Sequence, residues 1–127
     1  MSNQVVYGPY SPVFKAGDTY FVSGQLGVDG KTKAAPRTIE EQTHLLFTNL
    51  KQLLADNALE LDNIVKTTIY LMDIDDFAKV NDIYVTYFSE PRPARACVQV
   101  AQLPKVTTNG VPVMIEMDAV AYNKEQK

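Results

Sequence analysis

An arginine at the start of a predicted strand is the first residue of this chain that could do chemistry. Pro91 and Pro93 restrict the backbone just before it, and the side chains that follow alternate between two faces. Arg95, Cys97 and Gln99 share one face, and Ala96, Val98 and Val100 share the other. We expect the apolar set to face the core. The guanidinium of Arg95 would then point away from the core, where it could bind a carboxylate or phosphate through two parallel hydrogen bonds.

A second polar group lies on the last predicted strand, which covers residues 111–122. Val113, Ile115, Met117 and Ala119 share one face of it, and Met114, Glu116 and Asp118 share the other. A glutamate on the less apolar face of a terminal strand is usually exposed or ion-paired. The alternation therefore places Glu116 at a surface and assigns it no chemistry by itself.

The thiol of Cys97 suggests a nucleophile, but no catalytic partner can be argued for it. The sequence has one histidine, His44, which falls in a predicted helix at a solvated or partly packed position. One histidine and one cysteine also do not make a dedicated zinc site. We therefore expect neither thiol catalysis nor a metal.

Length and composition set the class of protein. The 127 residues suit one domain, 1–127, with enough buried surface for a core of its own. The net charge of −3 and the pI near 5.0 have the wrong sign for a protein that binds phosphate backbones, so nucleic acid is an unlikely partner. One cysteine excludes an intramolecular disulfide, and no leader or bilayer-spanning run is evident. We expect a cytoplasmic protein with no membrane partner.

The elements that position these residues follow from periodicity. A hairpin over residues 13–23 precedes a helix over 38–57, whose start has the capping-box pattern of Thr38 and Glu41. Residues 64–71 alternate as a strand, with Val65, Thr67, Ile69 and Leu71 on the more apolar face. A second helix begins near residues 73–75, ends at Pro91, and should bury Phe77, Val80, Tyr84, Tyr87 and Phe88. The order β-β-α-β-α-β-β predicts an α+β domain with both helices on one face of a mixed sheet.

The face of that sheet without helices is expected to carry Tyr70, Cys97 and Met114. Such a face is too apolar to remain in water, and oligomerisation would cover it. At the end of the hairpin, Gly24 permits either an unusual backbone angle or the close approach of a ligand. The two readings stay open at this point.

Eight short segments extend this interpretation. They are Gly8-Pro-Tyr-Ser11, Val22-Ser-Gly-Gln25, Glu40-Glu-Gln42, Asn49-Leu-Lys51, Val65-Lys-Thr-Thr-Ile-Tyr-Leu71, Asp76-Phe-Ala-Lys-Val-Asn81, Pro91-Arg-Pro-Ala-Arg95 and Leu103-Pro-Lys105. In this order they resemble the RidA family of enamine and imine deaminases, also called the YjgF family, from about Gly8 to Ala121. The resemblance implies a chorismate-mutase-like fold and a homotrimer. In such a trimer the three sheets form a central barrel and the active sites lie between subunits.

The resemblance also assigns roles. Arg95 matches the arginine that binds the substrate carboxylate, and Glu116 matches the glutamate that orients the attacking water, while Asp118 is expected to be structural. Cys97 is expected to line the pocket through its backbone carbonyl. The remaining matches to substrate-binding positions are Tyr10, Ser23, Gly24, Asn81 and Pro104; each of them also has a purely structural reading. Arg92, which lies between the two prolines, is expected to be solvated in a turn.

The implied reaction needs no cofactor. Dehydration of serine or threonine releases 2-aminoacrylate or 2-aminocrotonate, and the imine tautomers of these react with water to give a 2-oxo acid and ammonia. The enzyme would bind the carboxylate of this small 2-imino acid, place one water and handle a proton.

One departure and two alternatives remain. The loop from Val106 to Pro112 is longer than the family pattern and is expected beside the pocket, where it would affect substrate preference. Members of the family have been described as endoribonucleases or translation inhibitors, but the acidic pI weighs against this role. Alternatively, the trimer binds small carboxylates or acts as a chaperone-like module without turnover.

Overall fold

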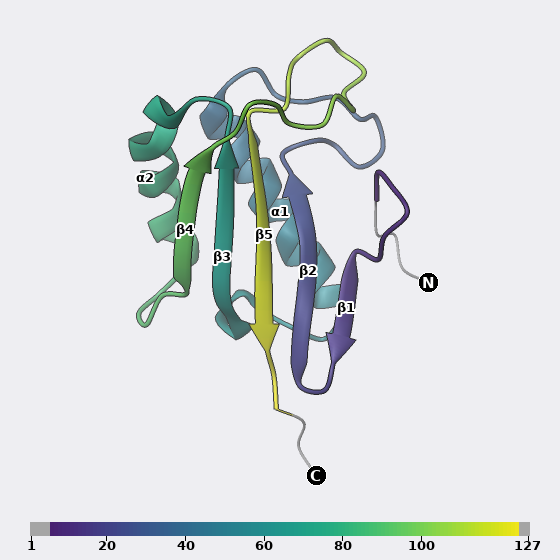
Figure 1. Ribbon diagram of the computed structural model, residues 1–127, viewed down its shortest axis with the longest axis vertical. Helices are drawn as coiled ribbons and strands as arrows, with labels where there is room; N and C mark the ends of the chain where they lie inside the picture. Colours follow the sequence, from purple (N-terminus) through teal and green to yellow (C-terminus); the bar gives the residue numbers. More distant parts are fainter. Residues whose placement is uncertain (1–5, 125–127) are drawn as a thin grey trace.

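The computed structural model describes residues 6–124, which form one five-stranded sheet with two helices on one of its faces (Figure 1). The strands are β1 (Val13–Ala16), β2 (Thr19–Leu26), β3 (Ile64–Leu71), β4 (Ala94–Gln99) and β5 (Ile115–Tyr122), and the helices are α1 (Ile39–Asp56) and α2 (Phe77–Tyr87). The sheet order is β1-β2-β5-β3-β4, with β3 and β4 parallel and the other neighbours antiparallel. The predicted α+β class and element order are confirmed. No helix within residues 6–124 has the length and apolar character needed to cross a bilayer.

Helix α1 begins where the capping pattern predicted. The hydroxyl oxygen of Thr38 accepts a hydrogen bond from the backbone N–H of Glu41 at 3.1 Å and donates to its carboxylate at 3.1 Å. The helix then buries Leu46, Leu50 and Leu54 completely against the sheet. Its position is therefore fixed both by a local cap and by the main core.

A buried amide joins α1 to two loops. The side chain of Gln42 donates to the carbonyls of Pro36 and Pro112 at 3.0 and 2.9 Å, and its oxygen accepts from the N–H of Met114 at 2.9 Å. Gln42 has no exposed surface, so these hydrogen bonds replace water for its side-chain amide. The segment that leads into β5 is held at the start of α1 in this way.

We expect Gln42→Leu to lower the free energy of unfolding by about 2–4 kcal/mol, because it removes three hydrogen bonds of a buried amide to partly buried backbone groups. Chemical denaturation in urea measures this loss. Gln52→Leu is the matched control, since Gln52 is exposed on the same helix and its amide bonds only Asp56. A similar loss in both variants would contradict this role of Gln42.

Helix α2 packs through a cluster of aromatic side chains. Val80, Tyr84 and Phe88 are buried as predicted, together with Ile83, and Tyr87 stacks on Phe47 with ring centroids 4.1 Å apart. The prediction for Phe77 is wrong, because this residue is 41% exposed. It begins the helix beside the edge strand β4, where the guanidinium of Arg95 is the group that lies over its ring.

Two predictions of strand faces are also wrong. A bulge in β3 between Ile64 and Lys66 leaves Ile64 buried and Val65 49% exposed, although Thr67, Ile69 and Leu71 face the core as expected.

In β4, Cys97 pairs with the buried Ile69 and packs against the main core, so Arg95 and Cys97 lie on the helix-covered side. The apolar Ala96 and Val98 lie on the other face, and Val98 is 45% exposed. The rule that apolar residues face the core fails here because the open face of the sheet is itself apolar.

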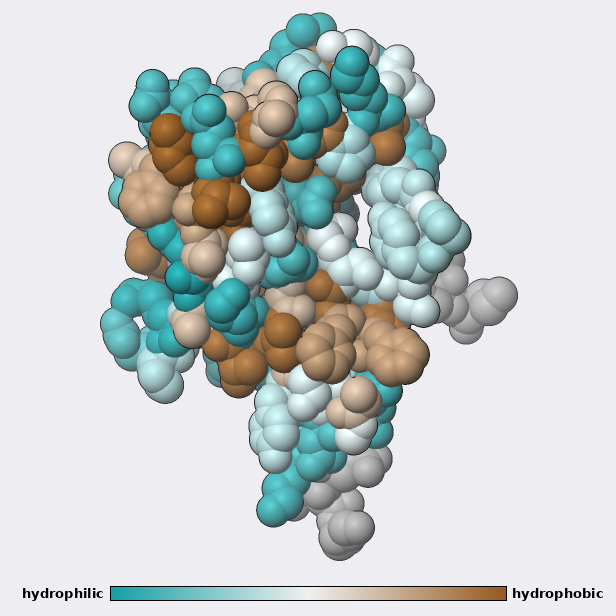
Figure 2. All heavy atoms as spheres, in the orientation of Figure 1, coloured by the Kyte–Doolittle hydropathy of each residue, from teal (hydrophilic) through white to brown (hydrophobic). Residues whose placement is uncertain are grey.

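The open face of the sheet points toward the viewer in Figure 2, where apolar side chains gather over its lower half. Phe14 is 63% and Phe21 is 49% exposed, and these two residues face each other across β1 and β2. Tyr70 lies on this face as predicted. Cys97 lies on the opposite face, and Met114 lies just before β5, partly buried against the core. The expectation that a second subunit covers this face remains a prediction.

Candidate active site

A pocket of about 390 Å³ forms where the end of β2 and the start of β5 meet the segments before β1 and before residue 105. The residues lining it that were predicted as site residues are Tyr10, Ser23, Gly24, Pro104 and Glu116, and the others are Tyr7, Val22, Leu26 and Asp118. The structure thus brings together predicted positions from Tyr10 to Glu116, which lie 106 residues apart in the sequence. We take this pocket as one half of the candidate site.

The observed position of the Glu116 carboxyl requires a residue without a side chain at position 24. A Cβ atom on Gly24 would lie 2.1 Å from the Oε2 atom of Glu116 and 2.7 Å from its carboxyl carbon, distances that no side chain could occupy. A bulge in β2 between Val22 and Gln25 changes the register with β5 at this point. The glutamate carboxylate therefore rests directly on the glycine backbone. The structure thus gives Gly24 a structural reason, the contact with Glu116, and its backbone angle is not in the left-handed region; the approach of a ligand to Gly24 remains a prediction.

The carboxyl of Glu116 is half-buried. Burial, and then the neighbouring carboxylate of Asp118, raise the pKa of Glu116 above the ordinary glutamate value. Asp118 in turn accepts a hydrogen bond at 3.0 Å from the hydroxyl of Tyr70 on β3. A carboxyl of this kind takes up a proton more readily than an exposed one, which suits proton transfer near neutral pH.

The hydroxyl groups of Ser23 and Tyr10, at the rim of the pocket, already make hydrogen bonds within the protein. The Oγ of Ser23 donates to the carbonyl of Ser11 at 2.6 Å, and the N–H of Ser23 donates to the carbonyl of Pro12. The hydroxyl of Tyr10 accepts from the N–H of Tyr7 at 3.3 Å, and Tyr10 is 47% exposed. These contacts hold the N-terminal segment against β2 and leave the ring of Tyr10 open to a ligand.

Arg95 lies elsewhere in the chain, at the outer edge of the sheet. Its guanidinium lies over the ring of Tyr84, 4.8 Å from the centroid, and over that of Phe77, 5.3 Å from the centroid. The hydroxyl of Tyr84 is fixed by a 2.8 Å hydrogen bond with the buried Thr67. Asn81 lies between the two aromatic residues in the helical repeat of α2, so it belongs to the same side of the molecule. The aromatic rings hold the arginine in place without neutralising its charge.

Cys97 neighbours Arg95 on this edge. Burial raises the pKa of the Cys97 thiol, and the nearby charge of Arg95 opposes the rise only in part. A protonated thiol is a weak nucleophile, which agrees with the expectation that this cysteine does not attack the substrate. His44 is exposed on α1 and bonds the hydroxyl of Tyr87 at 2.8 Å, and Arg92 is exposed and paired with Glu90, both as expected.

Within one chain, the two halves of the candidate site lie on opposite faces of the sheet. Glu116 is on the open face, because its neighbours in β5, Ile115 and Met117, are buried under the helices. Arg95 is on the helix-covered side at the β4 edge. The structure therefore brings Glu116 together with Gly24, and Arg95 with the aromatic residues of α2, but it does not bring Arg95 to Glu116.

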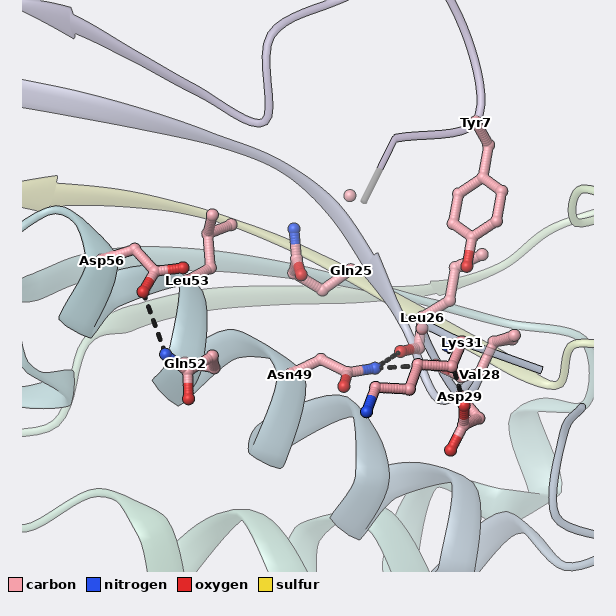
Figure 3. Close-up of a pocket in the computed structure, with 12 residues that line it drawn as sticks. Tyr7, Gln25, Leu26, Val28, Asp29, Lys31, Asn49, Gln52, Leu53 and Asp56 are labelled. Atoms are coloured by element: carbon pink, nitrogen blue, oxygen red, sulfur yellow. Dashed lines mark hydrogen bonds between the residues drawn. The ribbon is translucent and has the colours of Figure 1, made fainter. Parts of the chain in front are cut away.

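A larger cavity, of about 760 Å³, lies between the end of β2 and helix α1 (Figure 3). The side-chain amides that line it already make hydrogen bonds within the protein. Asn49 donates to the carbonyls of Leu26 and Val28 at 3.0 and 2.9 Å. Gln52, one turn further along α1, donates to Asp56 at 2.9 Å. Neither Arg95 nor Glu116 lines this cavity, and we do not take it as the catalytic site.

The loop at 106–112 does not line this pocket. The side chain of Asn109 bonds the N–H and the carbonyl of Ala35, and Thr108 bonds the backbone of Lys33 and Thr32. The loop is thus tied to residues 32–35, and Pro104 rather than any residue of 106–112 lines the pocket. The expectation that this loop affects substrate preference remains a prediction.

Sequence reasoning missed Tyr7 and Tyr70 as neighbours of the site. Tyr70 was placed on the correct face, but its approach to Asp118 depends on the register of β3 and β5, which alternation does not give. Tyr7 had no signal beyond a short apolar run. In the part of the chain that the structure describes, no group of three or more His, Cys, Asp and Glu side chains could hold a metal ion.

Fold and pocket together define a class: a single α+β domain with two helices on one face of a five-stranded mixed sheet and a carboxylate-lined pocket on its open face. Comparison with known proteins agrees with this class. The family model described as Endoribonuclease L-PSP matches residues 1–123. A RutC family protein of Pyrococcus abyssi is 42% identical over 118 residues, which are 92% of this chain and 88% of that protein. The Arabidopsis thaliana protein named Reactive Intermediate Deaminase A, chloroplastic, is 43% identical over 98 residues, 76% of this chain and 52% of that protein.

Solved structures give the same result. RidA from the Antarctic bacterium Psychrobacter sp. superposes with a TM-score of 0.87 at 34% identity over 97% of both chains. E. coli TdcF, whose structure holds bound serine, superposes with a TM-score of 0.85 at 32% identity over 98% of this chain and 97% of that one. The chain belongs to the RidA (YjgF) family, as its sequence segments predicted.

Proposed function

We propose that this protein hydrolyses reactive 2-imino acids to 2-oxo acids and ammonia. The observation that carries the proposal is the carboxyl of Glu116, which is half-buried in a small pocket and rests on a glycine. A glutamate held in this way is suited to take a proton from a water molecule beside it. Within residues 6–124 the guanidinium of Arg95 has no carboxylate partner, so its charge is available to bind a small acid.

The reaction divides between the two groups. Arg95 binds the carboxylate of the imino acid and orients its C=N carbon. Glu116 takes a proton from water as the oxygen adds to that carbon, and its carboxyl returns this proton to the imine nitrogen. In the resulting carbinolamine the hydroxyl proton passes to the nitrogen, the C–N bond breaks to release ammonia, and the C=O bond forms. Water and imine give 2-oxo acid and ammonia, with no oxidant or metal in the balance.

The two groups would meet between subunits. Arg95 lies at the free edge of β4 and Glu116 lies on the open sheet face, which is also the apolar face that needs cover. If a neighbouring subunit docks its β4 edge near the Glu116 pocket, it supplies the guanidinium and buries exposed apolar surface at the same time. We propose a homotrimer with shared sites, as the family resemblance implies.

The named relatives support this choice. Reactive Intermediate Deaminase A is a deaminase by name, and the TdcF structure holds serine, an amino acid with a carboxylate next to the carbon that bears nitrogen. An imino acid has the same carboxylate and the same carbon skeleton. The description of the family model as an endoribonuclease favours RNA cleavage instead, but a net charge of −3 and two carboxylates in the pocket oppose phosphate binding.

The direct test generates the imine in place. A threonine dehydratase is mixed with the protein, and the decay of the imine and formation of 2-oxobutanoate are followed. We expect hydrolysis to accelerate in proportion to protein concentration. If the folded protein binds small carboxylates without changing this rate, a binding function replaces the deaminase function.

We expect Glu116→Gln to lower kcat/KM by about 10²-fold or more, because amide cannot accept the proton of the attacking water. The pH profile gives a second readout: wild-type kcat/KM should fall as the pH decreases through the raised pKa of Glu116, and the variant should lack this limb.

Stability should change in the opposite direction. Because the pKa of Glu116 is raised on folding, its contribution to the free energy of unfolding is greatest at low pH and is lost as the pH rises through the raised value. Glu116→Gln should therefore be at least as stable as the wild type at neutral pH, as thermal denaturation would show. An unstable variant would mean that the loss of activity reports unfolding.

A further inference from the structure

Tyr70 and Asp118 lie on the same sheet face as Glu116 and are hydrogen-bonded to each other beside it. In the pairing of β3 with β5, Tyr70 is opposite Glu116 and Thr68 is opposite Asp118. The ring of Tyr70 extends diagonally, and its hydroxyl donates to the Oδ2 of Asp118 at 3.0 Å. Glu116 therefore has Gly24 on one side and the Tyr70–Asp118 pair on the other.

From this arrangement we infer that Tyr70 and Asp118 are positioning residues for the hydrolytic step: the phenol holds a second carboxylate beside Glu116, which makes Glu116 a stronger base toward the attacking water. The inference rests on the proposed function and deepens it. It assigns a role to a phenol that was predicted only to lie on the open face, and to an aspartate that was expected to be structural.

The charges around Glu116 support this role. On the open face, β5 contributes the carboxylate of Asp118, and β3 contributes Tyr70 and the ammonium of Lys66, which is turned to Thr68 at 3.0 Å. The residues of β2 in the pocket and the open-face residues of β4 carry no titratable group, and the N-terminal segment adds the phenols of Tyr7 and Tyr10. Asp118 is thus the negative group nearest in the strand, two residues along the same face.

Tyr70 is suited to hold that charge. Burial, and then its hydrogen bond to Asp118, raise the pKa of the Tyr70 phenol, so it remains a donor at any physiological pH. A donor of this kind stabilises the ionised form of Asp118 and fixes which way its carboxylate points. Without it, Asp118 would be free to turn toward water and away from Glu116.

The test measures the titration of Glu116 directly. Side-chain carboxyl ¹³C shifts of the folded, ligand-free protein are followed against pH in the wild type, Asp118→Asn, Tyr70→Phe and the double variant. We expect the titration of Glu116 to move to lower pH in Asp118→Asn, and less far in Tyr70→Phe. The double variant should match Asp118→Asn, because Tyr70 acts through Asp118. Tyr87→Phe, which removes a hydroxyl on the far side of the molecule, is the control.

Kinetics provide the second readout. The acidic limb of kcat/KM should shift to lower pH with the titration, and the plateau should fall about tenfold in Asp118→Asn, because a weaker base removes the proton more slowly. If the Glu116 titration does not move in either variant, the positioning role is wrong. If the titration moves and no variant, including the wild type, hydrolyses imines, the coupling stands and the proposed function fails.

Discussion

Arg95→Ala is expected to lower kcat/KM for a 2-imino acid by about 10²- to 10³-fold, because truncating one partner of a buried charged hydrogen-bond pair costs about 2–5 kcal/mol. The guanidinium rests over two aromatic rings and is not needed to neutralise a buried charge of its own chain. The variant should therefore fold, with only the loss of its cation–π contacts. Arg95→Lys should also lose most activity, since an ammonium cannot form the two-pronged contact.

The control for this prediction lies three residues away. Arg92 is exposed, and it is paired with Glu90 in the same proline-rich stretch. Arg92→Ala removes the same charge from the loop just before β4, so its kcat/KM should stay within about twofold of the wild type. Equal losses in both variants would show that net charge, and not a specific grip on the carboxylate, is what matters. Steady-state assays with the dehydratase-generated imine distinguish the two outcomes.

Gly24→Ala is expected to abolish most of the activity and leave the fold intact. The new Cβ would occupy the place of the Glu116 carboxylate, whose oxygen would be 2.1 Å away. Glu116 is a flexible side chain, so it can move aside at small cost to stability, but it then no longer faces the water it is proposed to activate. We expect kcat/KM to fall by about 10²-fold or more, as in Glu116→Gln.

A double-mutant cycle makes this prediction specific. In a Glu116→Ala background the carboxylate is absent, so Gly24→Ala should cause no further loss of activity. Additive losses in the double variant would mean that Gly24 serves another purpose, such as the approach of the substrate to its backbone N–H. Circular dichroism and thermal denaturation of all three variants confirm that they remain folded.

Local signals predicted most of the fold. The cap at Thr38, the apolar repeat of α1 and the alternation of β5 each depend on residues near in sequence and were found as predicted, although β5 begins at Ile115 and not at Val111. The failures came from contacts between distant segments. The bulge that exposes Val65 is a property of the β3–β5 pairing, and the face of Arg95 is set by the register of β4 against β3. The alternation of side chains within one strand does not determine either register.

The candidate site shows the same division. Tyr10, Ser23, Gly24, Pro104 and Glu116 were predicted from matching segments, and the structure gathers them in one pocket. The reason for Gly24 was not available from the sequence, because it depends on where the Glu116 side chain rests across the sheet. Arg95 and Asn81 could be named from the sequence. Their position relative to the pocket depends on the fold and, in the proposed trimer, on how the subunits assemble.

The central claim is that Arg95 of one subunit and Glu116 of another act on the same substrate. Arg95→Ala and Glu116→Ala subunits, each inactive alone, should be mixed in equal amounts, dissociated, reassembled and assayed for imine hydrolysis. Random assembly pairs an intact Arg95 with an intact Glu116 at about one quarter of shared sites, so we predict recovery of about one quarter of wild-type activity. If the mixed oligomers form and stay inactive, the site does not combine these two residues from different subunits, and the account is wrong.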